Sequence, residues 1–370
     1  MPYQDYKNGA YMIILSDDLG SIPLPNDVNK NTYTTGYFHA VEKIGQGSEL
    51  TNDSSSHIAF NKICRETMRG KLETGLDIVT YPQMGVDMIT QFLKPIREHP
   101  RQSSPPYLID EKYAVIPQLV SINPELEAFS EVHGEIPKLK VCITGPIELY
   151  LHTEVGRFVS EDLLMNIAES VRTFVKQAFI SVESAEINVV SIDEPSLGLR
   201  DLGMWDEDTL ISALQKATDF KKNITTQIHM HSLNSRHIPL QVEGINVLTC
   251  EYAGNPTQLK GVGKEEFEKY DKFLRVGIAR TDIDAINLEL HEKGIKNGFN
   301  RIKKGELPAS IIVEDPSIMI KRLKMVYKQF RDRLFFAGPD CGFGKWPTQE
   351  AALVQLSRTV SAISQFRRVT

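Results

Sequence analysis

Residues 226–232, Thr-Gln-Ile-His-Met-His-Ser, end a short apolar run with two histidines, His229 and His231. In an extended chain, residues two apart point to the same side, so both imidazoles can aim at one point just beyond the strand. Two neutral imidazoles suit Zn(II), which needs one or two further nitrogen, oxygen or sulfur ligands. Glu251 and Cys341, each close to the end of a later apolar run, could supply them. A His-x-His pair also occurs by chance, as two solvated or core histidines, so the pair alone does not define a metal site.

Composition describes an ordinary globular chain. Its 370 residues are 41% hydrophobic and 24% charged, which is enough for one large domain or two medium ones. The formal net charge of -6, without a dense Lys/Arg cluster, argues against a nucleic-acid partner. The first apolar run, residues 11–15, is too short for a signal h-region or a membrane span. We therefore expect a cytoplasmic protein with no membrane partner.

The four cysteines, Cys64, Cys142, Cys250 and Cys341, are too widely and unevenly spaced to form a disulfide framework. Cys64 lies in an amphipathic helical pattern and Cys142 in a buried-strand pattern, so both are expected in the core. Cys341 differs because it lies among Gly, Pro and Asp, where a side chain has no core to fill. This setting favours a chemical role for its thiol.

Short β-branched runs alternate with helical patterns along the chain. The expected strands are residues 11–15, 76–80, 139–144, 187–192, 224–228, 246–250, 273–278 and 333–336. The expected helices are residues 56–74, 86–94, 161–185, 206–220, 264–270 and 348–365, with a long helical region at 283–330. Eight strand-helix units predict a single (β/α)8 barrel, the TIM barrel of the α/β class, spanning residues 1–370. Excursions at about residues 23–50 and 96–136 could wall a pocket.

A doubly wound open sheet is the alternative architecture. It is disfavoured because no G-x-G-x-x-G turn follows the first strand. In the barrel, the active site lies at the carboxyl ends of the strands. The polar residues found there, in strand order, are Gly20 and Ser21, Gln83, Glu148 and His152, Asp193, His229 and His231, Glu251, Arg280 and Asp282, and Asp340 and Cys341. Two His, one Glu and one Cys on the fifth, sixth and eighth strands predict a metal set at one mouth.

Several of these strand ends resemble one known family as a set. They are Leu19-Gly-Ser-Ile-Pro23, Gly75-Leu-Asp77 with Asp87-Met88, Thr144-Gly-Pro146, Ile192-Asp-Glu-Pro195, His229-Met230, Glu251 and Pro339-Asp-Cys-Gly342. In order and placement, over nearly the whole chain, they resemble the catalytic C-terminal barrel of cobalamin-independent methionine synthase. That family binds zinc through His, Cys, Glu and Cys, and the zinc activates the thiol of homocysteine toward a methyl donor.

The resemblance implies roles for individual residues. His229, Glu251 and Cys341 would be zinc ligands. The Gly20-Ser21 turn would hold the carboxylate of the amino acid, and Asp193 would take its ammonium group. The expected function is therefore a methyltransferase that converts homocysteine to methionine.

The departures from the family pattern concern the ligands and the methyl donor. His231 stands where the family has a second Cys, so the site would hold one thiolate fewer; Cys250 is an alternative ligand, although neighbouring strand residues face opposite sides. Gln83, which could line the pocket, replaces a glutamate. His152 aligns with a tryptophan that lies along the folate pterin, and Asp282 with a histidine thought to protonate the donor.

With these changes, and without the family's second barrel, the residues expected to bind the thiol match the family pattern better than those expected to bind folate. They predict a corrinoid protein, or a one-carbon carrier of the methyltetrahydrofolate type, as donor, with His152 and Asp282 as candidate catalytic residues. Two alternatives remain open. One is a related metal-dependent methyltransferase acting on another thiol, such as coenzyme M. The other is a barrel that has kept its fold without the chemistry.

Overall fold

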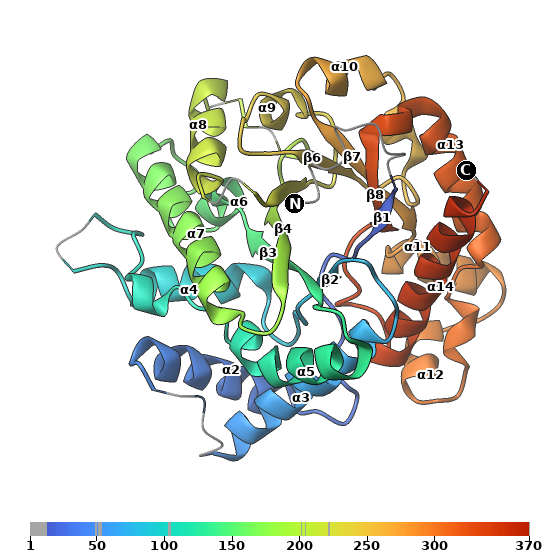
Figure 1. Ribbon diagram of the computed structural model, residues 1–370, viewed down its shortest axis with the longest axis horizontal. Coiled ribbons are helices and arrows are strands. Elements are labelled where there is room, and N and C mark those ends of the chain that lie inside the picture. The colour runs from blue at the N-terminus through green and yellow to red at the C-terminus, as the bar shows by residue number, and fades with distance from the viewer. Residues whose placement is uncertain are drawn as a thin grey trace.

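The computed structural model describes residues 13–48, 50, 54–102, 105–200, 202–203, 205–220 and 223–369. Eight parallel strands form its centre, and helices surround them (Figure 1). The strands are β1 (Leu15–Ser16), β2 (Val79–Thr80), β3 (Lys138–Thr144), β4 (Glu186–Asp193), β5 (Thr225–His229), β6 (Val247–Cys250), β7 (Phe273–Ala279) and β8 (Leu334–Pro339). Each expected strand is present, although β1 starts later than predicted; residues 11 and 12 lie outside the described residues.

The strands pair in the order β1-β8-β7-β6-β5-β4-β3-β2. A parallel bridge between Asp17 and Ile78 joins the first and last members of this order, and the Ile78 amide donates to the Ser16 carbonyl at 3.0 Å. A second parallel bridge, between Ser21 and Gln83, joins the segments that follow the two strands. The sheet is therefore curled into the predicted α/β (β/α)8 barrel. Its weakest seam is the one between β1 and β2, because both strands are only two residues long.

The helices follow the strands in chain order. They are α2 (Lys30–Gly45), α3 (Ser55–Leu72), α4 (Met88–Glu98), α5 (Pro117–His133), α6 (Pro146–Leu151), α7 (Glu161–Ser181), α8 (Glu207–Ala217), α9 (His237–Leu240), α10 (Lys264–Lys269), α11 (Ile283–Glu292), α12 (Gly298–Lys303), α13 (Pro316–Phe330) and α14 (Gln349–Arg367). Short 3-10 turns lie at η2 (Glu111–Tyr113), η3 (Pro256–Leu259), η4 (Ala309–Ile311) and η5 (Arg331–Arg333). None of the helices in the described part of the chain combines the length and apolar character needed to cross a bilayer.

Both expected excursions carry helices that the sequence pattern did not reveal, α2 and α5. Helix α2 is rich in Thr, Tyr and Gly, yet Tyr33 and Tyr37 are fully buried and pack against Phe60 of α3. Helix α5 starts at Pro117, a favourable first position, and ends at Gly134 in the left-handed region. Tertiary packing therefore overrides weak local propensity in both segments. That the whole chain is one domain stays a prediction.

The barrel interior contains an apolar layer and, next to it, a charged one. Ile78, Val189, Val247 and Phe336 form the apolar layer. The charged layer comes from β3, β5, β7 and the residue after β1, and consists of Lys140, Gln227, Arg275 and Asp17, all with exposed fractions of 0%. Alternation of side chains from odd and even strands is the usual way such barrels are filled.

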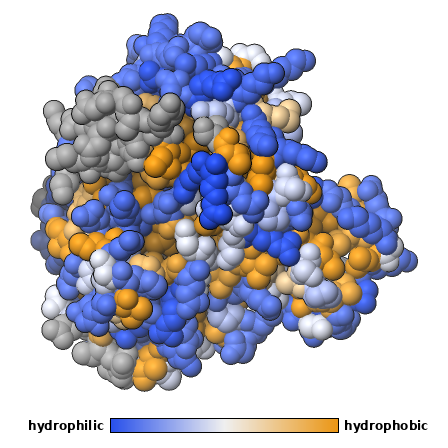
Figure 2. Space-filling model, turned by 45° about the vertical axis from the view of Figure 1, so that its right-hand side comes forward, coloured by the Kyte–Doolittle hydropathy of each residue, from blue (hydrophilic) through white to orange (hydrophobic). Residues whose placement is uncertain are grey.

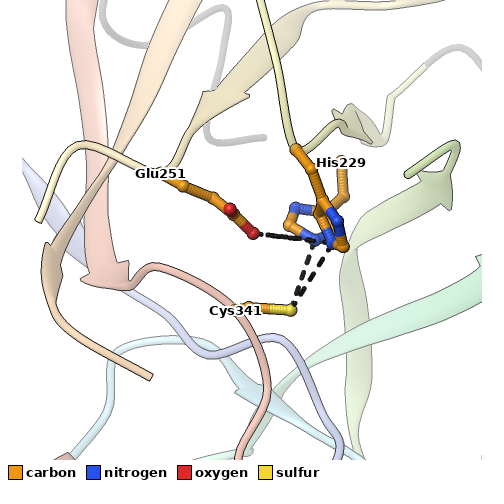
Figure 3. A group of neighbouring side chains, drawn as sticks. His229, Glu251 and Cys341 are labelled. Atoms are coloured by element: carbon orange, nitrogen blue, oxygen red, sulfur yellow. Dashed lines mark hydrogen bonds and ion pairs between the residues drawn. The ribbon is translucent and has the colours of Figure 1, made fainter. Parts of the chain in front are cut away.

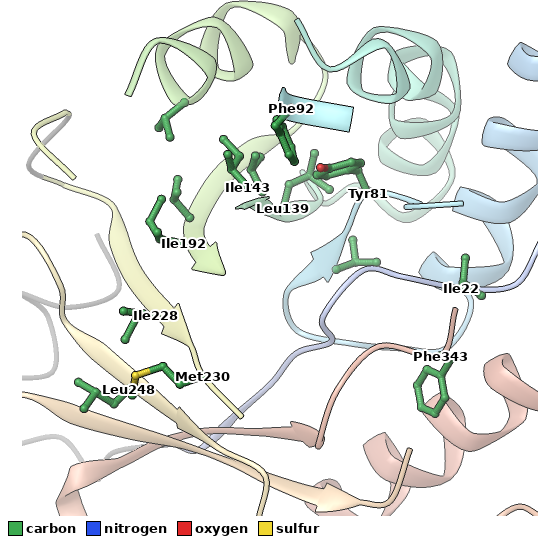
Figure 4. Close-up of a cluster of buried hydrophobic side chains, with 14 of the residues drawn as sticks. Ile22, Tyr81, Phe92, Leu139, Ile143, Ile192, Ile228, Met230, Leu248 and Phe343 are labelled. Atoms are coloured by element: carbon green, nitrogen blue, oxygen red, sulfur yellow. The ribbon is translucent and has the colours of Figure 1, made fainter. Parts of the chain in front are cut away.

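Between strands and helices lies a larger apolar core. Figure 4 shows part of it, with Leu139, Ile143 and Ile192 near Phe92, and Leu248 near Met230. On the outside, hydrophilic side chains dominate the face seen in Figure 2, with smaller apolar areas between them. The strand ends are thus fixed by packing on both sides, which is what a site built from several strands requires.

Candidate metal centre

The four predicted ligands lie together. One ligand atom each from His229, His231, Glu251 and Cys341 lies within 4.8 Å of the other three. His229 is the last residue of β5, Glu251 follows β6, and Cys341 follows β8 by two residues. Figure 3 shows these side chains pointing toward one another from separate strands.

The distances suit one four-coordinate ion. Cys341 Sγ lies 3.7 Å from His229 Nε2 and 3.8 Å from His231 Nε2, while Glu251 Oε1 lies 4.0 and 3.5 Å from the same two nitrogens. Tetrahedral zinc with ordinary Zn–N and Zn–S bonds places its ligand atoms about 3.3–3.8 Å apart. The residues therefore fit the predicted metal, as an N2OS donor set that needs only small inward movements.

Burial sets the protonation of the cluster. It lowers the pKa of His229 well below 6.5, so this imidazole is neutral, the form in which it can bind a metal. Burial, with the Asp340 carboxylate nearby, raises the pKa of Glu251 to about 8, and burial together with the charge of Glu251 raises the pKa of the Cys341 thiol to about 12. Without a cation the cluster thus keeps its protons, and a metal would displace them.

Two residues that received no role from the sequence hold the ligands in place. Thr249 Oγ1 lies 3.1 Å from His229 Nδ1 and accepts the Met230 amide at 3.1 Å, leaving Nε2 to face the cluster. Asp340 accepts the amides of Ala253 and Gly254 at 2.9 and 2.6 Å, which fixes the loop after Glu251. Thr249 could have been found in the sequence, since it lies two residues before Glu251 and so on the same face of the strand.

The Gly20-Ser21 turn adjoins the Cys341 loop. Gly20 has φ +86°, and a Cβ there would collide with the Gln83 side chain, so the turn requires glycine. The Ser21 carbonyl accepts the Phe343 amide at 2.7 Å, and its Oγ lies 3.4 Å from the Gly344 amide nitrogen. The structure therefore brings this predicted substrate turn beside the metal cluster.

Asp193 ends β4, in register with His229 on β5. Ser191 Oγ donates to Asp193 Oδ1 at 2.7 Å, and burial raises the pKa of Asp193 to about 7. Its neighbourhood also contains Glu148, a buried carboxylate on α6 that accepts the Ser196 amide at 3.1 Å. Burial lowers the pKa of His231, and the charge of Glu148 opposes this shift.

The remaining predicted residues lie further from the ligands or have other partners. The Gln83 amide nitrogen donates to Tyr81 Oη at 2.8 Å and to the Cys142 carbonyl at 3.2 Å. His152 Nε2 lies 3.1 Å from Glu148 Oε1, and its side chain is 37% exposed. The roles of Gln83 and His152 stay predictions.

Asp282 and Cys250 both have partners outside the ligand cluster. Asp282 is exposed and caps α11, accepting the Asp284 amide at 2.9 Å. Its catalytic role stays a prediction. The Cys250 thiol is buried and faces Gln258 Oε1 at 4.0 Å, so the structure groups Glu251, not Cys250, with the histidines.

Fold and cluster together define a (β/α)8 barrel with a metal-binding type of site at its carboxyl-terminal mouth. Among curated proteins, the chain is similar to the methionine synthase of Sulfurisphaera tokodaii, with 21% identity over 315 residues, covering 81% of this chain and 80% of that protein. No family model matches the chain.

Solved structures show the same fold. A B12-independent methionine synthase from Shewanella sp. W3-18-1, in complex with selenomethionine, has a TM-score of 0.56 at 13% identity, covering 96% of this chain and 98% of that one. A putative B12-independent methionine synthase from Listeria monocytogenes has a TM-score of 0.53 at 14% identity, covering 96% of this chain and 99% of that one. A methyltransferase from Methanosarcina mazei has a TM-score of 0.50 at 12% identity, covering 94% of both chains. These findings confirm the predicted fold, the resemblance to cobalamin-independent methionine synthases and the methyltransferase class.

Proposed function

We propose that this protein is a zinc-dependent methyltransferase that methylates the thiol of homocysteine to give methionine. The observation that carries the proposal is the cluster of His229, His231, Glu251 and Cys341 at the mouth of a methionine-synthase-like barrel. A zinc ion held there would lower the pKa of the substrate thiol and keep it as a thiolate beside the donor.

The chain's own residues would bind and orient the amino acid. The Gly20-Ser21 turn, next to the Cys341 loop, would hold the carboxylate, and Asp193, one strand away from His229, would take the ammonium group. Holding the sulfur in line with the methyl group is itself a large part of catalysis. In the reaction the sulfur lone pair forms the S–CH3 bond, the donor–CH3 bond breaks with its electrons staying on the donor, and the thiol proton goes to solvent.

For the donor, we propose a methylated corrinoid protein or another one-carbon carrier, in preference to folate polyglutamate. The support is chemical: His152 and Asp282 stand where the folate-using family has a tryptophan and a histidine, and both are at least partly exposed to an incoming donor. His152, paired with Glu148, and Asp282 are then the groups available to exchange protons with it.

The test begins with metal content. Elemental analysis of zinc-loaded protein without a histidine tag should give about one zinc per chain, and His229→Ala and Cys341→Ala should each lose it. Cys250→Ala is the matched control, because it removes a buried cysteine outside the cluster and should retain the zinc.

Activity is then measured with homocysteine and, in turn, methylcobalamin, methyltetrahydrofolate or a methylated corrinoid protein. Methionine formation by wild type and Cys250→Ala, but not by the two zinc-free variants, is the expected result. Stoichiometric zinc without methylation of homocysteine would reject the proposed substrate, and the screen would then turn to other thiols, starting with coenzyme M. If the wild type binds no zinc, the remaining alternative is a barrel that has kept its fold without the chemistry.

A further inference from the structure

The charged layer of the barrel interior contains one carboxylate and two cations. Asp17 pairs with Lys140 Nζ at 2.7 Å and with Arg275 Nε at 2.6 Å, and all three side chains are fully buried. Gln227 Nε2 also donates to Asp17, at 2.9 Å. One carboxylate cannot neutralise two cations, so this layer has a surplus positive charge.

The uncompensated positive charge lies on the edge of the Arg275 guanidinium that is formed by Nη1 and Nη2. Its Nη1 and Nη2 atoms have no hydrogen-bond partner among the described residues, whereas Lys140 and Nε of Arg275 are bound to Asp17. Gly338 makes room for this edge, because a Cβ at that position would overlap Arg275 Nη2. Gly338 belongs to β8 and lies three residues before Cys341, so the guanidinium is packed against the strand that carries a ligand.

Arg275 lies one layer beneath the cluster. It is in register with Thr249 on β6, and Glu251 is the next residue along that chain segment on the same face. On its other side the Nη2 edge lies against Gly338, three residues before Cys341. Two residues of extended chain span about 7 Å, so the guanidinium lies close beneath the ligands. Buried charges at such range are weakly screened.

A surplus cation beneath the site has a use during thiol binding. With zinc, two neutral histidines, Glu251 and Cys341, the ligand set would be electrically neutral. A bound substrate thiolate then adds one negative charge beside ligands that are buried or half-buried. We infer that Arg275 is a positioning residue that stabilises the anionic sulfur of the substrate from beneath the barrel mouth. This inference rests on the proposed function.

The chain offers charge-matched variants to test it. Arg275→Met leaves Asp17 paired one-to-one with Lys140, and Lys140→Met leaves it paired one-to-one with Arg275. Both remove one buried positive charge, but only Arg275→Met removes the one beside the Cys341 strand. Since neither leaves Asp17 without a cation, both should fold, with melting temperatures close to wild type. Arg275→Gln repeats the test if the methionine variant does not fold, and Arg275→Lys keeps the charge.

Calorimetry on zinc-loaded protein compares homocysteine, which can bind as an anion, with methionine, whose thioether cannot ionise. We expect Arg275→Met to weaken the binding of homocysteine at least about tenfold more than it weakens the binding of methionine. Lys140→Met should have a smaller effect, and Arg275→Lys should restore most of the binding. Equal losses for homocysteine and methionine, or equal effects of Arg275→Met and Lys140→Met, would overturn the inference.

A second measurement does not depend on homocysteine. Arg275 repels a dication as it attracts an anion, so Arg275→Met should bind zinc severalfold more tightly than wild type in a competition assay with a chelator. Wild type that binds zinc but no homocysteine would reject the proposed substrate, and the zinc affinities would still decide the role of Arg275. Zinc affinity that is unchanged or weaker in Arg275→Met would reject the inference.

Discussion

Thr249 determines which nitrogen of His229 can bind a metal. Its hydroxyl lies 3.1 Å from Nδ1, so that nitrogen can donate its proton to Thr249 while Nε2 presents a lone pair to the cluster. Hydrogen bonds of this kind orient metal-binding histidines, and their loss typically weakens metal affinity about 10–100-fold. The hydroxyl therefore belongs to the metal centre although it does not reach the ion.

Replacing Thr249 by Val keeps the shape of the side chain and removes the hydroxyl. We expect zinc to bind about 10–100-fold more weakly, as measured by competition with a chromophoric chelator. Thr249→Ser, which keeps the hydroxyl, is the control and should stay near wild type. Wild-type affinity in Thr249→Val would show that the ring is held by packing alone.

How far the site could be predicted from the sequence also depends on single residues. The four ligands were accessible because each lies at a strand end and has a side chain suited to metals. The cations beneath them were not, because Lys140 and Arg275 lie in apolar runs, where nothing local shows that Asp17, 123 and 258 residues away, is their partner. Such long-range pairs become visible only when the barrel closes.

At the scale of elements, the short strands β1 and β2 depend on a carboxylate. Asp77 accepts both the Ser16 amide and the Ser16 hydroxyl at 2.6 Å, and it also pairs with Arg367 of α14. This residue therefore connects two strands that are joined by isolated bridges and not by a continuous ladder, and it also connects them to the last helix.

Asp77→Asn should destabilise the protein by about 1–3 kcal/mol near neutral pH, because charge-assisted hydrogen bonds are lost. Although burial opposes it, Arg367 and Ser16 hold the pKa of Asp77 below 3.8, so its stabilisation is complete above the unfolded pKa and is lost as pH falls through the lower folded value. The gap in denaturation midpoint between wild type and Asp77→Asn should accordingly narrow below about pH 4. A gap independent of pH would mean that the charge contributes nothing.

Helix α3 is fixed to the Gly20 turn by a buried ion pair. Lys71 Nζ lies 2.7 Å from Asp18 Oδ2, with 1% and 4% of the two side chains exposed, and Asp18 also accepts the amides of Gly20 and Thr80. Lys71→Met leaves a buried carboxylate without its cation and should cost about 3–5 kcal/mol in the free energy of unfolding. The double variant Asp18→Asn/Lys71→Met should lose less than the single one in the same urea titration. A larger loss in the double variant would contradict the pairing argument.

The elements themselves were largely predictable. All eight strands appear near their expected places because parallel strands buried on both faces are continuous apolar runs. Helices α2 and α5 were missed, since Thr, Tyr, Gly and internal Pro124 obscure their helical period and only packing against α3 makes them helical. The long helical region at 283–330 divides into α11, α12 and α13 for the related reason that turns at Gly294 and Gly305 adopt positive φ.

At the scale of the molecule, a metal would join β5, β6 and β8. Zinc that binds only the folded chain should stabilise it by about 2.7–4 kcal/mol at 100 to 1,000 times its dissociation constant. We therefore expect EDTA to lower the melting temperature of the zinc-loaded protein by a few degrees. The Cys341→Ala variant should be insensitive to both zinc and EDTA. An unchanged melting temperature in wild type would favour the barrel without chemistry.

The ligands are also far apart in the order in which the chain is made. Cys341 lies 112 residues after His229 and follows the last strand, so a growing chain carries both histidines and Glu251 long before the thiol leaves the ribosome. Translation is slow compared with the folding of local structure. The complete four-ligand centre can therefore form only after all eight strands have been synthesised, which makes tight zinc capture a natural marker of a completed barrel.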